Sequence, residues 1–373
     1  MEWAHTRFDC QVLWVEPYPI RLPRLSDAKR LLHRFKADKK QLQALAWKNA
    51  PWLQVLQPPS LPLEPLPGGA AVCSWIQHSL RQHLQELLED AQTWLTIGRP
   101  SGMALTLCQK QQGNRVLYDV MDDMAQFNRG ISREWVEHTH QQLTQQVETV
   151  WGSSQRIVQK LSAATRHPPI LVRNGVNLSM VSSLEQRTTS TAKPLLRYQQ
   201  SLIIGYVGTL AAWFDWAILI RLAKALPKAQ FHIYGPLEGI HPPDLPSNVE
   251  LRGPIAHESI SGLMRTWHAG LIPFLKNELT QSVDPVKYYE YRACGLPILS
   301  TMFGEMLFHA VHDPEVWFFE RLDFSKIETF LREWHEKQEF LTEYEKSSFS
   351  DYLKHASWPE RFETGVANCS WLV

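Results

Sequence analysis

The chain has 373 residues, a formal net charge of +0, a hydrophobic fraction of 44% and a charged fraction of 20%. This length predicts about two domains, and the composition excludes a chain that is mainly disordered. Because positive and negative charges balance, the sequence also argues against a protein that coats nucleic acid, and we expect no nucleic-acid partner.

The cysteines and the N-terminus indicate the compartment. Five cysteines are scattered without any CxxC pair, which predicts neither a disulfide framework nor a zinc site. The first residues, MEWAHTRFDC, lack the apolar segment of a signal peptide. No run reaches the roughly 18 apolar residues of a membrane-spanning helix. We therefore expect a cytoplasmic protein whose membrane contact, if any, is peripheral.

Short apolar runs alternate with amphipathic ones along the first half of the chain, which is typical of an α/β domain with parallel strands. The predicted strands cover residues 11–16, 52–57, 92–97, 116–121, 147–151 and 170–172. The predicted helices cover residues 26–48, 72–91, 132–146 and 155–163.

Basic and apolar residues are interleaved in the segment 21–48. Nine lysines and arginines, Arg21 and Arg24 among them, stand against Asp27 and Asp38. One interpretation is the solvated face of a helix. The other is a surface that contacts anionic lipid, because leucine, phenylalanine and tryptophan lie between the charges. On the second interpretation Arg21 and Arg24 are candidate acceptor or membrane contacts.

Two acidic residues, Asp122 and Asp123, follow the predicted strand in VLYDVMDDM. At the carboxyl end of a strand they could bind an acceptor or act as the general base for its hydroxyl group. Alternatively they cap the following helix, because aspartate is favoured at that position. The sequence leaves both interpretations open.

Periodicity is lost in the Ser-, Thr- and Gln-rich stretch 180–200, so we place the domain boundary between residues 185 and 186. Strands are predicted after it at residues 202–207, 230–234, 249–252, 270–273, 297–300 and 316–319. Helices are predicted at residues 216–226, 258–268, 285–294 and 324–337, with a final helix at 349–362.

The segment DPVKYYEYRACGLPILS carries the most specific chemistry. Lys287 and Glu290 are three residues apart and share one face at the start of a helix. A helix N-terminus and a lysine attract phosphate oxygens, and a carboxylate one turn on can accept hydrogen bonds from ribose hydroxyls. Gly208 ends the strand of LIIGYVGTL and would let a phosphate approach the backbone. The alternative is an ordinary surface pair of lysine and glutamate.

The order of the segments YVGTL, HIYGP, NVELRG, AGLIPF and DPVKYYEYRACGLPILS resembles the donor lobe of family-four glycosyltransferases. The resemblance is greatest to bacterial enzymes of exopolysaccharide, teichuronic acid and lipopolysaccharide synthesis. It implies the α/β fold called GT-B, with two Rossmann-like doubly wound domains facing a cleft. On this basis we expect an acceptor-binding lobe at 1–185, a nucleotide-sugar-binding lobe at 186–348, and a C-terminal helix in 349–373 that crosses back.

The resemblance also implies roles for individual residues. Glu290 matches the second glutamate of the family's E-x7-E motif and would bind the ribose, while Lys287 and the backbone near Gly208 would hold the diphosphate. Gly235 and Arg252 match loops that line the base pocket. Ser282 stands where the first glutamate is usual, so that Asp284 or Glu278 is expected to take its place.

A second departure concerns the phosphate charge. Thr209 stands where the family has an arginine. The positive charge for the phosphates is therefore expected from Lys287 alone, or with help from Arg21, Arg24 or Arg173.

The implied reaction is transfer of a hexosyl group from a nucleotide diphosphate sugar to a saccharide or lipid-linked acceptor. Lys287, Asp122 and Asp123 are the expected catalytic residues. We expect retention of anomeric configuration and neither a metal nor another cofactor. Two alternatives remain, namely a nucleotide-sugar epimerase of the same fold and an inactive protein that only binds nucleotide-sugar. The basic segment adds an expected peripheral contact with the anionic inner face of the plasma membrane.

Overall fold

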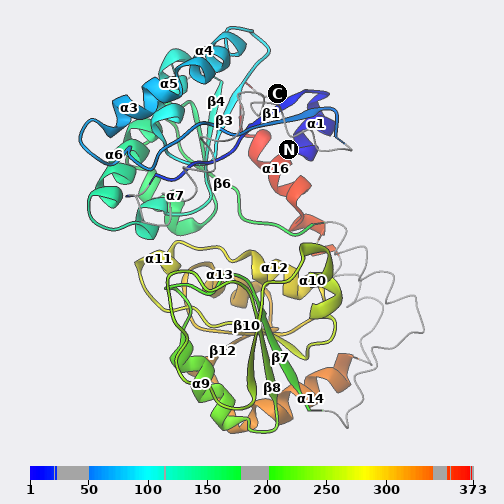
Figure 1. The fold of residues 1–373 in the computed structure, drawn as a ribbon. Coiled ribbons are helices and arrows are strands. Elements are labelled where there is room, and N and C mark those ends of the chain that lie inside the picture. Colours follow the sequence, from blue (N-terminus) through cyan, green and yellow to red (C-terminus); the bar gives the residue numbers. More distant parts are fainter. Residues whose placement is uncertain are drawn as a thin grey trace. The chain divides into compact units, whose positions relative to one another are not determined.

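The computed structural model describes residues 1–20, 22, 50–112, 115–177, 201–338, 351–352, 354–369 and 371. The chain forms two compact units, each built from separate stretches of sequence (Figure 1). The first unit comprises residues 1–152, 157–170 and 369–373, and the second comprises residues 153–156 and 171–368. The helix predicted at 26–48 lies outside the described residues.

The boundary predicted between residues 185 and 186 falls in the stretch 178–200, which the structure does not describe, and it stays a prediction. Two observations bear on the expected division. Residues 171–177 already belong to the second unit, and the chain rejoins the first unit at Cys369. Within the described part of the chain, every helix is too short or too polar to span a bilayer.

The first unit contains two sheets. One pairs β1 (Val12–Val15) with β2 (Leu53–Leu56), and the other has the order β3-β4-β5-β6. Its strands are β3 (Leu95–Ile97), β4 (Val116–Val120), β5 (Thr149–Gly152) and β6 (Ile170–Leu171). Its helices are α1 (Glu2–Phe8), α3 (Gly69–Ile76), α4 (His78–Leu87), α5 (Gly102–Lys110), α6 (Ile131–Gln146) and α7 (Gln155–Leu161), the last beginning at the junction with the second unit.

Three differences from the predicted elements concern helices, and the first is that α1 was not predicted. The single helix predicted at 72–91 is wrong, because α3 and α4 are separate helices divided at Gln77. Helix α5 was not predicted. It begins at Ser101, whose hydroxyl accepts a hydrogen bond from Ala104 N at 3.1 Å, so a serine cap was the available sequence signal.

The second unit is built on a six-stranded sheet with the order β12-β11-β10-β7-β8-β9, and its strand pairs are parallel. The strands are β7 (Ile203–Val207), β8 (Gln230–Tyr234), β9 (Val249–Gly253), β10 (Ala269–Ile272), β11 (Ile298–Ser300) and β12 (Val316–Phe318). The chain order reverses between the neighbours β7 and β10. In open parallel sheets, ligands bind beyond the carboxyl ends of the strands at such a reversal.

Helices surround this sheet (Figure 1). They are α9 (Trp216–Ala225), α10 (His257–Met264), α11 (Glu278–Gln281), α12 (Val286–Ala293), α13 (Gly304–His312) and α14 (Ile327–Gln338). The second unit also includes α16 (Trp358–Val366). Helix α13 was not predicted. Of the final helix predicted at 349–362, residues 351–352 and 354–355 are helical, while 349, 350 and 353 lie outside the described part. A separate helix, α16, begins at Trp358 and ends four residues beyond the prediction.

Close packing at the centre of the sheet explains one glycine. Gly205 lies in the middle of β7, and a methyl group at this position would overlap the indole ring of Trp267. Trp267 is completely buried and also packs edge-to-face against Tyr291 of α12. The strand therefore tolerates no side chain here, because a core at native density has no room for one.

Gly205→Ala is therefore expected to destabilise the protein by about 1–3 kcal/mol through overpacking against Trp267. Gly262→Ala is the matched control, because Gly262 is exposed on α10 and nothing lies within 4 Å of the added methyl group. That control should be neutral or slightly stabilising. Urea denaturation measures both changes, and equal stabilities for the two variants would contradict the packing argument.

Candidate functional site

Three neighbouring strands end in glycines with left-handed backbone conformations. Gly208 follows β7 with φ 146°, Gly235 follows β8 with φ 141°, and Gly253 ends β9 with φ 67°. Hydrogen bonds join each strand end to the next: Gly208 N donates to Tyr234 O at 2.9 Å, and Gly235 N donates to Gly253 O at 2.8 Å. The carboxyl edge of the sheet thus presents bare backbone beside the chain reversal.

At Gly208 and Gly235 the structure leaves no room for a side chain. A Cβ at Gly235 would overlap Gly208 O, so glycine is required for the two strand ends to approach. A Cβ at Gly208 would lie 2.5 Å from Nζ of Lys287. Glycine at position 208 therefore makes room for the lysine side chain.

Lys287 occupies the point of reversal in the sheet. It lies in the first turn of α12, which begins after Pro285, and its ammonium is 5.4 Å from the ring centre of Tyr206 and 6.0 Å from that of Phe274. Tyr206 belongs to β7 and Phe274 follows β10, the two strands between which the order reverses. Burial lowers the pKa of Lys287, while Glu290 raises it. An anion beside this ammonium would be strongly favoured.

Glu290 lies one turn further along α12 and is half-buried. Burial raises the pKa of its carboxyl group, and the charges of Lys287 and His257 lower it. The structure therefore brings together Lys287, Glu290 and Gly208, as the sequence predicted. Thr209 is adjacent and half-buried, and its carbonyl accepts a hydrogen bond from Tyr206 at 2.9 Å.

Arg252, which was predicted to line the base pocket, is exposed and hydrogen-bonded to neighbouring side chains. It is exposed on β9, where its Nε donates to Glu250 at 2.8 Å and its Nη1 donates to the hydroxyl of Tyr234 at 3.3 Å. Its guanidinium is therefore engaged with side chains of β8 and β9. The assignment of Arg252 to a base pocket stays a prediction.

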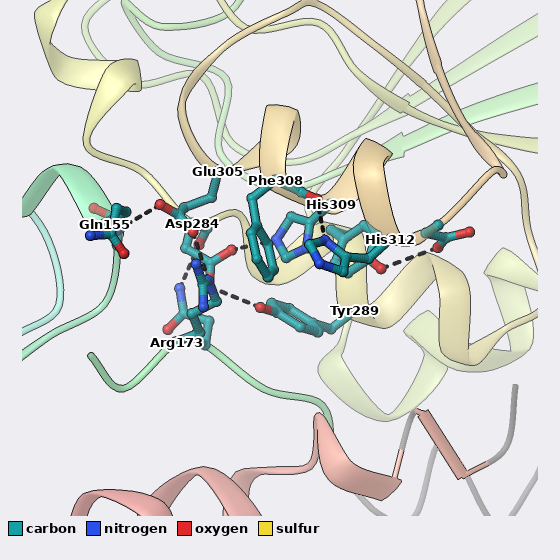
Figure 2. Close-up of polar contacts among 12 residues, drawn as sticks. Gln155, Arg173, Asp284, Tyr289, Glu305, Phe308, His309 and His312 are labelled. Atoms are coloured by element: carbon teal, nitrogen blue, oxygen red, sulfur yellow. Dashed lines mark hydrogen bonds and ion pairs between the residues drawn. The ribbon is translucent and has the colours of Figure 1, made fainter. Parts of the chain in front are cut away.

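Asp284 is 2% exposed, and its carboxylate is engaged inside the unit. It accepts hydrogen bonds from His309 Nε2 at 2.8 Å, Asn174 N at 2.8 Å and Tyr289 Oη at 2.9 Å (Figure 2). The expected contact of Asp284 with a donor sugar is not what the structure presents. Ser282, which takes the place of the first glutamate of the motif, is also fully buried.

A second buried carboxylate lies in α13 and was missed from the sequence because the helix itself was missed. Glu305 accepts hydrogen bonds from Gln155 N at 2.6 Å and from Arg173 Nε at 2.7 Å, and the Arg173 guanidinium also lies 3.7 Å from the ring centre of Phe308 (Figure 2). Arg173 is thus paired within the second unit. The expectation that it helps with phosphate binding stays untested.

The acidic residues of the first unit follow β4. Asp123 does not cap the next helix, since its side chain makes no capping hydrogen bond and instead accepts from Lys160 Nζ at 2.8 Å. Asp119, within β4, is an additional candidate. Burial, assisted by the nearby Asp122 carboxylate, raises the pKa of Asp119 to about 7. The sequence signal was a charged residue inside an otherwise apolar strand.

Two further predicted residues, Arg21 and Arg24, lie outside the described residues. For metals, the part of the chain that the structure describes contains no group of three His, Cys, Asp or Glu side chains arranged to hold an ion.

No family model matches the chain. The chain is 23% identical over 207 residues to TuaH of Bacillus subtilis (strain 168), named as a teichuronic acid biosynthesis glycosyltransferase. The match covers 50% of each protein, so the chain spans about half the length of the curated relative it matches.

Solved structures match over nearly the whole chain. Anabaena HepE in complex with UDP-glucose has a TM-score of 0.54 and 15% identity, covering 95% of this chain and 97% of that one. Sucrose-phosphate synthase from Thermosynechococcus elongatus has a TM-score of 0.54 and 12% identity, covering 97% and 95%. WaaG, a glycosyltransferase involved in lipopolysaccharide biosynthesis, has a TM-score of 0.53 and 10% identity, covering 96% and 100%.

The chain has the GT-B fold of these proteins, with two Rossmann-like units. The resemblance to glycosyltransferases of polysaccharide and lipopolysaccharide synthesis, inferred from the sequence motifs, is confirmed.

The raised pKa of Asp119 predicts a pH dependence of stability. Because the folded pKa of about 7 exceeds the unfolded value near 4, the folded state holds its proton longer, and stability falls as pH rises from about 4 to 7. Asp119→Asn should remove about 2–4 kcal/mol of this decline. The test is urea denaturation at pH 5 and pH 8, with Asp90→Asn at an exposed site as control. Parallel pH curves for wild type and Asp119→Asn would contradict the prediction.

Proposed function

We propose that this chain is a glycosyltransferase that moves a hexosyl group from a nucleotide diphosphate sugar to a saccharide or lipid-linked acceptor in cell-surface polysaccharide synthesis. One observation carries the proposal, namely the Lys287 ammonium beside Gly208 at the chain reversal of the second sheet. A HepE structure of the same fold holds UDP-glucose, and TuaH is named for teichuronic acid synthesis, which supports the substrate class.

The donor site combines charge with bare backbone. Lys287 would offset the negative charge that develops on the departing nucleotide diphosphate, aided by the N-terminus of α12. Glu290 would accept hydrogen bonds from the ribose hydroxyls. Gly208, Thr209 and Gly235 would allow the phosphates to approach the strand ends. This mode of leaving-group stabilisation requires no metal, and we propose a metal-independent reaction with retention.

The acceptor site is assigned to the carboxyl end of β4. Asp122 and Asp123 are the proposed contacts for the acceptor hydroxyl, although Asp123 also pairs with Lys160. Asp119, with its pKa raised to about 7, adds a carboxyl group that can exchange a proton near neutral pH.

A peripheral contact with the cytoplasmic face of an anionic membrane belongs to the same proposal. Leu22, within the basic segment 21–48, is exposed and donates through its backbone N to Ser132 Oγ at 3.2 Å. Near that anchor the side chains of Phe127 and Ile131 are 44% and 40% exposed. Arg129 and Arg133 are exposed beside them. Apolar groups flanked by arginines suit an anionic lipid surface.

A thermal-shift panel of UDP-, GDP-, dTDP- and ADP-sugars tests the donor site. A ligand at 100 times its Kd should stabilise the folded protein by about 2.7 kcal/mol. Lys287→Ala and Glu290→Ala should abolish the shift because they remove the contacts with diphosphate and ribose. Lys224→Ala and Glu333→Ala, at exposed positions of the second unit, should keep it.

Other results of these experiments would indicate another binding place or another function. Unchanged shifts in both site variants would show that the donor binds at another place. Conversion of the donor without any acceptor would indicate an epimerase. A donor that binds but is never consumed, whichever acceptor is supplied, would indicate an inactive nucleotide-sugar-binding protein.

Vesicle sedimentation tests the membrane contact. The protein should sediment with vesicles rich in phosphatidylserine and should not bind phosphatidylcholine vesicles. Salt at ~0.5 M should release it, because that ionic strength screens the attraction between surface charges. Combined Arg21→Glu and Arg24→Glu should weaken binding by about 1 kcal/mol or more per charge. Combined Lys224→Glu and Lys228→Glu, both exposed on the second unit, are the charge-matched control. Equal binding of both vesicle types would refute the contact.

A further inference from the structure

One buried carboxylate joins three separate parts of the second unit. Asp284 accepts from His309 of α13, from the backbone N of Asn174 in the stretch that enters the unit, and from Tyr289 of α12 (Figure 2). The side chains of His309 and Asp284 are 1% and 0% exposed. A carboxylate with three donors and no access to solvent is held in one position.

This carboxylate lies next to the proposed donor site in the chain. Asp284 directly precedes Pro285, after which α12 begins, and Lys287 is three residues beyond Asp284. Tyr289 is on the same helix, so its hydrogen bond ties the residue before the helix to the second turn. The side-chain amide of Asn174 also donates to the backbone carbonyl of Asp284. The start of α12 is therefore fixed on both sides.

His309 orients the carboxylate from α13. Its ring stacks on Tyr288 with centroids 3.7 Å apart and an interplanar angle of 14°. Its Nδ1 is buried and has no hydrogen-bond partner among the residues described. The proton is therefore assigned to Nε2, which faces Asp284. Burial and the carboxylate raise the pKa of Tyr289 far above its usual range, so its hydroxyl remains a donor.

We propose that Asp284 is a positioning residue for nucleotide diphosphate binding, acting through Tyr289 and the start of α12 rather than by touching the donor. This inference rests on the proposed function. The sequence predicted that Asp284 contacts the donor directly. We infer an indirect effect instead, because the carboxylate is buried and its oxygens already accept three hydrogen bonds. A displacement of the first turn by a fraction of an ångström would move Lys287 away from the phosphates.

The carboxylate cannot be replaced by its amide without loss. In Asp284→Asn one oxygen becomes an NH2 group. Facing the N–H of Asn174, that group would put a donor against a donor. Facing His309, it would force the imidazole proton from Nε2 to Nδ1, which is buried and has no partner among the residues described. The isosteric variant should therefore shift the helix start even though its volume is unchanged.

Tyr289→Phe is the most conservative test, and the chain provides its matched control. The neighbouring Tyr288 is on the same helix and equally buried, but its hydroxyl donates to Asp313 at 3.1 Å. Asp313 is a comparably buried carboxylate that also accepts from Arg292 at 2.7 Å. Tyr288→Phe thus removes a buried hydroxyl, and Asp313→Asn changes a buried carboxylate, at a hydrogen bond that does not involve the residue before α12.

Calorimetric titration of the full-length variants with UDP gives the readout, together with thermal unfolding without ligand. Tyr289→Phe and Asp284→Asn should weaken UDP binding on the order of tenfold, the scale expected when a binding group is misplaced by a fraction of an ångström. Tyr288→Phe and Asp313→Asn should lower the unfolding temperature to a similar extent but leave the UDP affinity within about twofold of wild type.

The other outcomes distinguish failure of this inference from failure of the proposed donor site. If the Tyr289 and Tyr288 variants lose UDP affinity equally, or neither loses any, Asp284 has no positioning role and the inference is overturned. Lys287→Ala separates this from failure of the proposed function. If wild type binds UDP, GDP, dTDP or ADP and Lys287→Ala binds equally well, or if none of the four binds, then the proposed donor site itself is wrong.

Discussion

The rest of the second unit is arranged around one half-buried cation, the ammonium of Lys287 between the rings of Tyr206 and Phe274. A desolvated ammonium is costly unless negative charge is near, and Glu290 supplies part of it one turn away. Position 208 must be glycine because the lysine occupies the space a side chain would need. Glycine, lysine and glutamate thus form a single physical constraint, although 82 residues separate the outermost two.

Much of this could be predicted from local sequence. The spacing of Lys287 and Glu290 indicated one helix face, the glycine after an apolar run indicated a strand end, and alternating apolar and amphipathic segments indicated parallel sheets. These features depend on periods of two or 3.6 residues and on glycine chemistry, which act over a few positions. The strands of the second unit were accordingly located to within one residue at every end.

The parts that escaped prediction depend on tertiary contacts. Helix α13 has no side-chain cap at Phe303, so its start carries no local signal, and Glu305 and His309 were missed with it. Asp284 looked like a donor contact from its place in the motif, because sequence cannot show that His309, Asn174 and Tyr289 converge on it. Asp123 likewise followed the pattern of a helix cap, yet pairs with Lys160, 37 residues away.

The segment 153–156 has a practical consequence for anyone who wishes to dissect the protein. Ser154 Oγ donates to Ser282 O at 2.8 Å, and Gln155 N donates to Glu305 at 2.6 Å, so four residues from the N-terminal part complete the second unit. A fragment cut at residue 171 would remove the donors to Ser282 O, at the end of α11, and to one carboxylate oxygen of Glu305, at the start of α13. Separate expression of the two halves calls for a circular permutant that carries these four residues along, rather than a simple truncation.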